Sequence, residues 1–341
     1  MKNKIIMILI AAMIFVLFMT GCSYKNTDNH SKEPLNNEDK DNNENPLVSE
    51  YGVEIKENSV IFTDSMDKKV EVKKNPKKVV ILQNSLLDIW DSCGGTVVGR
   101  LEYTEEKPVE NAKSAEVVGT VGTPSLEKIL SLEPDLVMIL SDYNSHKEMI
   151  PALEQSNIQV VAFNDDVRVD YYRTLRIFSA LTDREDLYKD IISVVKDEVE
   201  KIIAKAPTDK NYKAIILRAT SKAIAARDSN TMVGEMLKDL NVTNIADSMS
   251  ESQDTKTFSM EKLIQEDPDF IFVITMGSDM EKIKERLKSE VESNPAWASL
   301  KAVKGDRYIV LPKDLYMYKP NIRYAEAYEN LAKILYPEVF K

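Results

Sequence analysis

Residues 125–140 read SLEKILSLEPDLVMIL, and residues 259–274 read SMEKLIQEDPDFIFVI. Serine, glutamate, lysine, proline and aspartate recur at equivalent places, the apolar positions match in kind, and the two copies begin 134 residues apart. Each copy predicts a short helix capped by its serine, a turn fixed by its proline and a buried strand. The spacing is that of a lobe rather than of a solenoid repeat. We therefore expect an α/β protein with two similarly built lobes.

Strand and helix signals alternate around the first copy, which favours a mostly parallel sheet in each lobe. Apolar runs predict strands over residues 78–82, 96–99, 136–140 and 159–163. Helical periodicity predicts helices over residues 86–92, 126–132 and 147–155. A short hairpin over residues 60–73 is expected before them.

A long helical stretch separates the two copies, over residues 170–206. Thr182-Asp183-Arg184-Glu185 has the form of a capping box, so one helix should end near Leu181 and another should run from Asp183 to Lys205. At about 1.5 Å per residue the second helix is about 35 Å long, enough to brace one lobe rigidly against the other and to restrict closure to small angles. Apolar residues recur at helical spacing through both helices of this stretch: Leu175, Phe178, Leu181, Leu187, Ile191, Val194, Val195, Val199 and Ile202.

The first residues have the pattern of a secretion signal. Lys2 and Lys4 precede a fifteen-residue apolar run from Ile5 to Met19, which is too short to span a bilayer comfortably. The following Thr20-Gly21-Cys22 completes a segment that resembles a bacterial lipobox. That resemblance implies cleavage before Cys22 and its acylation, palmitate included, which would anchor the protein to the outer face of a bacterial cell membrane. A plain signal peptide or an N-terminal membrane anchor is the alternative.

Residues 23–50 consist largely of Asn, Asp, Glu and Lys. Such a stretch cannot bury enough surface to offset its ordering entropy, so it is expected to be a disordered tether. The predicted organisation is a lipoprotein signal peptide over residues 1–21, a tether over 22–50, a first lobe over 51–169, an interlobe helix over 170–206 and a second lobe over 207–341.

Composition excludes several classes of function. With 45 Lys plus Arg against 56 Asp plus Glu, the net charge is −11, which argues against nucleic acid as a partner. The chain has two Cys and two His, so a zinc centre would need nearly all of them, and no metal site is expected. Cys93 is expected to be a small buried hydrophobe, and His30 a solvated residue of the tether.

An enzyme is also disfavoured. No G-x-S-x-G motif or phosphate-binding glycine loop is present, and the whole chain has ten glycines. The competing hypotheses are a lipid-anchored hydrolase that uses His146 as a base, and a structural adhesion protein. The simpler expectation for His146 is an exposed or capping residue.

Five ordered segments form a recognisable pattern: NPKKVV from Asn75, VGTVGTPSLEKILSLEPDLV from Val118, SMEKLIQEDPDFIFV from Ser259, NPAWASLKAVKGDRYIVLP from Asn294 and AEAYENLAKILYPE from Ala325. Together they resemble the helical-backbone (class III) substrate-binding proteins of ABC importers, which handle ferric siderophores, haem and vitamin B12. The resemblance implies a ligand cleft between two lobes and an ABC permease as partner. It also implies that one glutamate on each lobe, Glu127 and Glu261, engages permease arginines. The alternative is that each is an acid favoured by the dipole of its own helix.

Ligand contacts in such folds come from the carboxyl ends of the strands. Arginines from both lobes suit an anionic ligand, and aromatic rings suit the apolar face of a large chelate. The candidates are Arg100, Tyr103, Tyr143, Arg218, Arg227, Met276, Tyr316, Tyr318 and Lys319. For the arginines and Lys319 the alternative is a solvated rim, and for the tyrosines and Met276 it is the core.

A ferric siderophore is the first choice of ligand. Haem is the second, with Met276, Met317 or a tyrosine as axial ligand, and vitamin B12 the third. No cofactor beyond this transported ligand is expected, and we expect a monomer.

Overall fold

The computed structural model describes residues 50–103, 108–248, 256–257 and 259–341. The predicted signal peptide and nearly all of the predicted tether, with Cys22 and His30, lie outside these residues. Among the residues described, no helix is both long enough and apolar enough to cross a bilayer. The described residues belong to one compact unit, which contains a five-stranded and a six-stranded sheet, a three-stranded sheet and a two-stranded pair.

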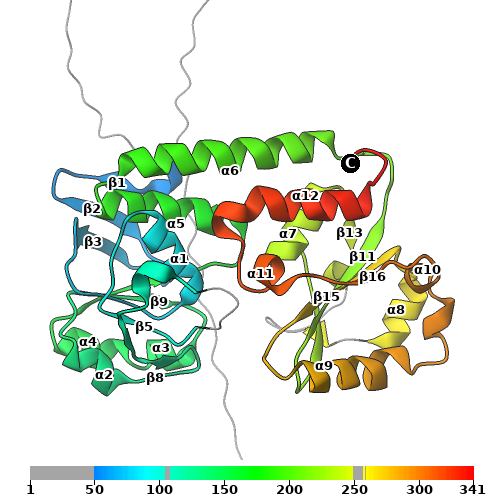
Figure 1. The fold of residues 1–341 in the computed structure, drawn as a ribbon, viewed down its shortest axis with the longest axis horizontal. Coiled ribbons are helices and arrows are strands. Elements are labelled where there is room, and N and C mark those ends of the chain that lie inside the picture. Colours follow the sequence, from blue (N-terminus) through cyan, green and yellow to red (C-terminus); the bar gives the residue numbers. More distant parts are fainter. Residues whose placement is uncertain (1–49, 104–107, 249–255, 258) are drawn as a thin grey trace, which may run out of the picture. The chain divides into compact units, whose positions relative to one another are not determined.

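The first lobe is built on a parallel sheet of five strands (Figure 1). In spatial order these are β10 (Gln159–Phe163), β9 (Leu136–Leu140), β4 (Val79–Ile81), β5 (Gly99–Arg100) and β6 (Glu116–Val117). The helices of this lobe are α1 (Asn84–Ser92), α2 (Leu126–Ser131), α3 (Asn144–Lys147) and α4 (Ile150–Gln155). An antiparallel sheet precedes them, formed by β1 (Glu54–Ile55), β2 (Ser59–Thr63) and β3 (Lys69–Lys73). A short antiparallel pair, β7 (Gly119–Thr120) and β8 (Thr123–Pro124), leads into α2.

The predicted alternation of strands and helices is confirmed in this lobe. Strands β9 and β10 have the predicted bounds, whereas the strand expected over 96–99 is confined to Gly99–Arg100. The helix expected over 147–155 is two short helices, because Pro151 lies in the first turn of α4 and has no N–H to continue a preceding helix.

The second lobe has a mixed sheet in the spatial order β14 (Lys256–Thr257), β12 (Ile224–Arg227), β11 (Lys213–Ala219), β15 (Phe270–Thr275) and β16 (Tyr308–Val310), with β13 (Thr243–Asn244) also paired to β11. Strands β13, β11, β15 and β16 pair in parallel, and β12 and β14 are antiparallel. The helices are α7 (Met232–Asp239), α8 (Met260–Glu266), α9 (Met280–Leu287), α10 (Lys301–Lys304) and α11 (Lys313–Tyr316).

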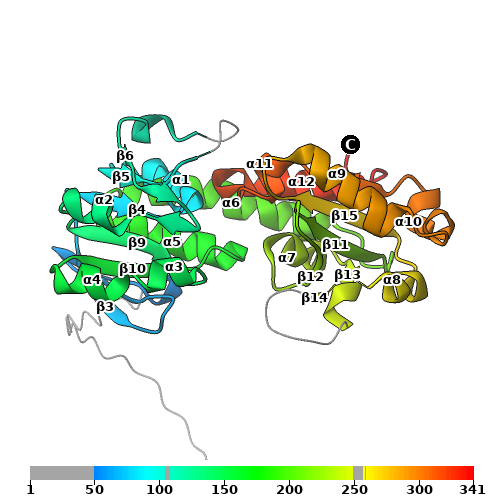
Figure 2. The ribbon, with the colours of Figure 1, turned by 90° about the horizontal axis from the view of Figure 1, so that it is seen from below.

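The two copies of the sequence repeat form the same unit in each lobe. In β9 the odd-numbered residues Val137 and Ile139 belong to the core under α2, and in β15 the equivalent Ile271 and Val273 belong to the core under α8. The alternate residues of both strands face one continuous core that extends through both lobes. Figure 2 shows α2 and α4 at one end of the described fold and α8 and α10 at the other. Each repeat helix therefore covers the face of its sheet opposite the shared core.

Both repeats use their serine and aspartate in the same way. Ser125 and Ser259 cap α2 and α8 by accepting the backbone N–H three residues on, at 3.4 and 3.2 Å. The Asp135 carboxylate accepts the N–H groups of Lys77 and Lys78, which lead into the neighbouring strand β4, at 2.7 and 3.0 Å.

The Asp269 carboxylate accepts the N–H of Lys213, the first residue of the neighbouring strand β11, at 2.9 Å. The proline-aspartate turn of each repeat thus fixes the start of the next strand in its sheet.

The interlobe connection consists of two helices. α5 (Arg168–Leu181) packs on α1 of the first lobe, and α6 (Glu185–Lys205) packs on α5 and on α12 (Tyr324–Leu335) of the second lobe (Figure 1). The end of α5 at Leu181 and the end of α6 at Lys205 are as predicted. The apolar stripe is confirmed in part: Val195 and Val199 are buried, but Val194 is 61% exposed.

The predicted capping box at the start of α6 is wrong. Thr182 closes the end of α5 instead, because its hydroxyl donates to the carbonyls of Phe178 and Ser179. Asp183 has a φ of 59°, and this left-handed residue turns the chain between the two packed helices. Arg184 occupies the N-cap of α6 without a side-chain hydrogen bond, and the helix begins at Glu185.

We expect Asp135→Ala to lower the free energy of unfolding by about 1–3 kcal/mol, because it leaves two backbone donors without their charged acceptor. Asp269→Ala removes one such bond and should cost less. Urea melts followed by circular dichroism would measure both. Glu127→Ala, an exposed residue of the same repeat, serves as control and should stay within about 0.5 kcal/mol of the wild type. Equal stability of all four proteins would contradict the role assigned to the aspartates.

Candidate functional site

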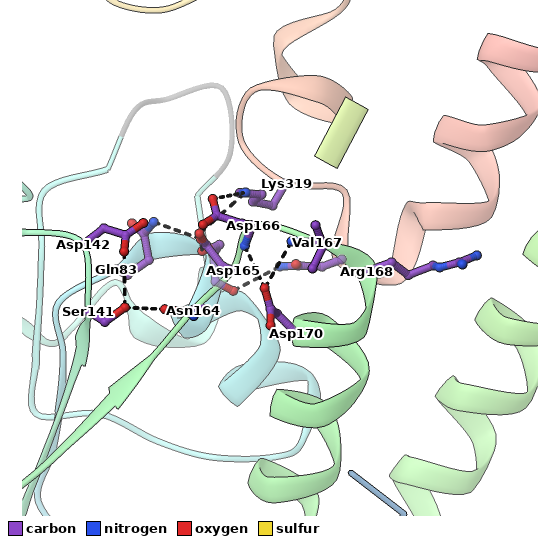
Figure 3. A network of polar contacts seen from close by, with 12 residues as sticks. Gln83, Ser141, Asp142, Asn164, Asp165, Asp166, Val167, Arg168, Asp170 and Lys319 are labelled. Atoms are coloured by element: carbon purple, nitrogen blue, oxygen red, sulfur yellow. Dashed lines mark hydrogen bonds and ion pairs between the residues drawn. The ribbon is translucent and has the colours of Figure 1, made fainter. Parts of the chain in front are cut away.

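The carboxyl ends of the strands in the two lobes are brought together across the interlobe space. The most direct contact joins Lys319 of the second lobe to Asp165, which follows β10 in the first lobe. The Lys319 Nζ lies 3.6 Å from the Asp165 carboxylate and 3.9 Å from that of Asp166 (Figure 3). The side chains of Lys319 and Asp165 are only 19% and 15% exposed. Solvent therefore screens this ion pair less than it would screen a surface pair.

Asp165 is also held from within its own lobe. Its Oδ2 accepts a hydrogen bond from the Ser85 hydroxyl at 2.5 Å and one from the Gln83 amide at 3.1 Å. Beside it, the Ser141 hydroxyl contacts Asn164 (Figure 3). The residues that follow β4, β9 and β10 are thereby tied into one polar network.

The segment that carries Lys319 crosses to the first lobe and is held there at a second point. The Asn321 amide donates to the Ser85 carbonyl at 3.0 Å and to the Asp88 carboxylate at 2.6 Å. Lys319 and Asn321 have φ values of 58° and 50°. A left-handed lysine is unfavourable on its own and persists only where surrounding contacts determine it. We name residues 318–323 the crossover segment.

Two arginines lie on the inner face of the second sheet. Arg227 is paired in register with Ile216, two residues from Arg218 on the same side of β11, so the two guanidinium groups are diagonal neighbours. Burial lowers the pKa of Arg218, and Arg227 lowers it further. Among the described residues, no carboxylate forms an ion pair with Arg218.

Tyr143 of the first lobe lies within electrostatic reach of Arg218. Burial raises the pKa of Tyr143, Asp165 adds to the rise, and Arg218 opposes it. Its hydroxyl therefore lies in the field of an acidic group on its own lobe and of a basic group on the other. The Tyr143 ring stacks on His146 with centroids 5.1 Å apart, which fixes its orientation.

A cavity of about 500 Å³ lies between the lobes at the start of α5 and α7. Its size is within the range of ligand pockets. Its walls are mostly polar and come from both lobes: Asn164, Asp166, Val167, Asp170, Ser229, Asn230, Glu235, Lys238 and Asp239. Burial raises the pKa of Asp166, of Asp170 and of Glu235.

Arg168, at the start of α5, forms a second contact between the lobes. Its backbone N–H donates to Glu235 at 2.7 Å, and its guanidinium lies 3.1 Å from the Asp239 carboxylate. Asp239 also accepts the Tyr328 hydroxyl of α12 at 2.7 Å. The cavity is therefore closed on the side of the interlobe helices by a hydrogen-bonded joint.

Two of the predicted ligand residues are in the protein interior. Arg100 is buried, donates to the carbonyls of Ala112 and Leu101, and lies over the ring of Tyr103 at 4.0 Å. Its guanidinium therefore supports a loop of the first lobe. Tyr316 is a core residue and not part of the interlobe wall, because it is 3% exposed and its hydroxyl donates to the Ala327 carbonyl.

The other ligand residues stay predictions. Tyr103, Tyr143, Met276 and Tyr318 are partly buried, and Lys313 lies over the Tyr318 ring at 5.5 Å. The sequence-based choice missed Asp165, Ser85, Arg168 and Asn321. The one available signal was the position of Asp165 directly beyond a buried strand.

The two predicted docking residues occupy equivalent places. Glu127 and Glu261 are exposed in the first turns of α2 and α8. Helices of a parallel α/β unit run opposite to the strands, so these first turns lie toward the carboxyl edges of the sheets. Neither glutamate has an ion-pair partner among the described residues.

His146 is not the exposed or capping residue that was expected. It is fully buried, its Nε2 pairs with the Val121 carbonyl at 2.9 Å, and its Nδ1 accepts the Leu140 N–H at 3.4 Å. Burial lowers its pKa. Both ring nitrogens are engaged, which leaves none to act as a base. Within the described residues, no three His, Cys, Asp or Glu side chains are grouped to hold a metal ion.

Two α/β lobes, joined by a long helix and enclosing a polar cavity at their strand ends, define a two-lobed solute-binding protein. The periplasmic binding protein family model matches residues 79–315, and the chain belongs to that family. The predicted family and fold class are confirmed.

Relatives and solved structures agree with this assignment. The Fe(3+)-citrate-binding protein YfmC of Bacillus subtilis is 25% identical over 334 residues, 95% of each chain. The petrobactin-binding protein YclQ of the same organism is 23% identical over 276 residues, 78% of this chain and 84% of that one. The siderophore-binding protein FeuA of B. subtilis, complexed with ferri-bacillibactin, has the same fold, with a TM-score of 0.65 at 21% identity over 81% of this chain and 98% of its own.

The buried His146 predicts a pH dependence of stability. Its pKa in the folded protein is below the ordinary value of 6.5, so the unfolded chain binds more protons between the two values. The free energy of unfolding should therefore fall as the pH is lowered below about 6.5, by at most about 1.4 kcal/mol per pH unit from this residue. His146→Gln should lose this part of the slope in urea melts between about pH 7 and 5. Parallel pH curves for the two proteins would contradict the assignment.

Proposed function

We propose that the protein is the extracytoplasmic solute-binding lipoprotein of an ABC importer and that it captures a ferric siderophore-type iron chelate between its lobes. The chelate is then delivered to the permease, and a partner ATPase supplies the energy. The mechanism is binding followed by modest closure, without a chemical reaction. Acylated Cys22, which lies outside the described residues, anchors the protein to the outer face of the membrane.

The observation that carries this proposal is the environment of Arg218. The Arg218 guanidinium is half-buried, has another arginine beside it and forms no ion pair with a carboxylate of the described residues, which is unfavourable in the unliganded protein. An anionic ligand would compensate for both the lost hydration and the repulsion. The planar donor fork of arginine suits the oxygen atoms of carboxylate or catecholate groups.

The relatives support an iron chelate as the ligand. YfmC and YclQ are named for binding ferric citrate and petrobactin, and further B. subtilis relatives are named as ABC transporter substrate-binding lipoproteins. Haem is the second candidate. The haem-complexed IsdE of Staphylococcus aureus has the same fold, with a TM-score of 0.65 at 21% identity over 76% of this chain and 98% of its own. Met276 and Met317 are partly buried residues that could serve as axial ligands.

Ligand identity is tested by titrating the intrinsic tryptophan fluorescence with ferric enterobactin, ferrichrome, haemin and cyanocobalamin. Trp90 lies in α1, whose first turn belongs to the polar network at the interlobe space, so it is placed to respond. Saturable quenching by a ferric siderophore supports the proposal. A response to haemin alone would move haem to first place, and no response to any of the four would overturn the proposal.

Arg218→Met should weaken binding of ferric enterobactin at least about tenfold while the free energy of unfolding stays unchanged or rises by up to about 1 kcal/mol. Affinity and stability change in opposite directions because the Arg218 charge is unfavourable in the unliganded protein and favours binding of an anionic ligand. Titration calorimetry and urea melts measure the two effects.

Arg307→Met is the matched control, because Arg307 is a partly buried arginine of the same lobe that precedes β16, at the opposite end of the sheet. It should leave affinity unchanged. If Arg218→Met destabilised the protein without weakening binding, a structural role would replace the binding role.

Glu127→Ala combined with Glu261→Ala should leave chelate affinity intact and lower iron uptake by cells that depend on this protein. The reason is that exposed ion pairs contribute only about 0.2–1 kcal/mol each, so the pair orients a transient contact with the permease. Glu133→Ala combined with Glu281→Ala, two other exposed glutamates of the two lobes, is the control. Unchanged uptake by the docking variant would contradict the proposed contact.

A further inference from the structure

The Asp165 carboxylate receives contacts from three residues in two separate parts of the chain. Ser85 and Gln83 donate to its Oδ2, and the Lys319 ammonium lies beside its Oδ1 (Figure 3). The two donors from the first lobe fix the carboxylate, and the carboxylate in turn fixes the ammonium of the second lobe. Asp166 is also near Lys319, but it is 49% exposed, and neither Ser85 nor Gln83 donates to it.

The backbone of the crossover segment supports the same assignment. Lys319 has a left-handed conformation, and Asn321 holds the segment to the Ser85 carbonyl and to Asp88. Because the segment is attached at both points, the ammonium is placed against Asp165 by geometry and not only by attraction.

The position of this ion pair matters because the arginine pair borders the same interlobe space. Tyr143 lies within electrostatic reach of both Asp165 and Arg218, which act on its pKa in opposite directions. An anion bound at Arg218 would therefore meet a lysine whose charge is already balanced by a carboxylate.

We propose that Asp165 is a positioning residue that sets the charge selectivity of the binding site. It holds Lys319 against the first lobe and neutralises its charge, so that Lys319 offers less positive charge to a ligand bound at Arg218. This inference rests on the proposed binding of an iron chelate. When Asp165 loses its charge, it no longer balances the charge of Lys319, and the site favours anions more strongly.

The test is Asp165→Asn, which keeps an oxygen that can accept from Ser85 and Gln83 but removes the charge. We expect the affinity for ferric enterobactin, which is anionic, to rise by about three- to tenfold. The affinity for ferrichrome, which is uncharged, should stay the same. A structural defect would lower both affinities, so their ratio distinguishes charge selectivity from a change in the fold. Thermal melting confirms that each variant is folded.

Asp142→Asn is the matched control. It makes the same change of charge on the same lobe, at an exposed aspartate that does not form an ion pair with Lys319. In a Lys319→Gln background, Asp165→Asn should give no more gain than Asp142→Asn, because Asp165 acts through Lys319.

The inference would be overturned if Asp165→Asn and Asp142→Asn raised the affinity for ferric enterobactin equally. It would also be overturned if the gain in affinity from Asp165→Asn persisted in the Lys319→Gln background. Either result would leave only a general effect of net charge. A wild-type protein that binds only ferrichrome still tests it, because Asp165→Asn should then acquire binding of ferric enterobactin. If it does not, the inference is wrong. Failure of the wild type to bind any of the four ligands would overturn the proposed function, and this inference with it.

Discussion

The packing of α6 against both lobes is the constraint on which the binding site depends. Its apolar stripe, with Val195 and Val199, joins one continuous core with α5 on the first lobe and α12 on the second. Opening this core would expose apolar surface at about 25 cal/mol per Å², whereas the polar contacts at the strand ends exchange for contacts with water at small net cost. Motion between the lobes is therefore expected to change the ion pairs and hydrogen bonds first and to leave the helix packing intact.

The two sides of the interlobe space carry charges of opposite sign. The first lobe contributes Asp165 and Asp166, and the second contributes Arg218 and Arg227, while Lys319 crosses between them. A fully paired site would gain little from a charged ligand, because each new contact would replace an existing one. Arg218 is the exception, because it forms no ion pair within the described part of the chain and would gain a new contact from an anionic ligand.

The sequence was sufficient for the parts of the fold that depend on local pattern. The repeat predicted β9 as observed, the capping serines and the buried strand β15, because period and caps lie within sixteen residues. It failed where the determining contact is distant. His146 is buried with its Nε2 hydrogen-bonded to the carbonyl of Val121, twenty-five residues away, and Arg100 turns inward and donates to the Ala112 carbonyl. The predicted start of α6 was wrong because Asp183 adopts a left-handed conformation that turns the chain between the packed helices α5 and α6. Asp165 was missed because its partners, Ser85 and Lys319, lie 80 and 154 residues away in the chain.

The duplication that determines the fold also bears on the proposed docking contacts of Glu127 and Glu261. Glu127 and Glu261 occupy the same position in equivalent units, so any partner that engages both must match the distance between the lobes. Once one contact has formed, the other forms at a high effective concentration, and it is lost if the geometry does not fit. Two ion pairs of about 1 kcal/mol or less each would then form together only when the lobes are correctly spaced, and they would be too weak to hold the protein in place. A receptor that must release its cargo and leave requires contacts of this strength.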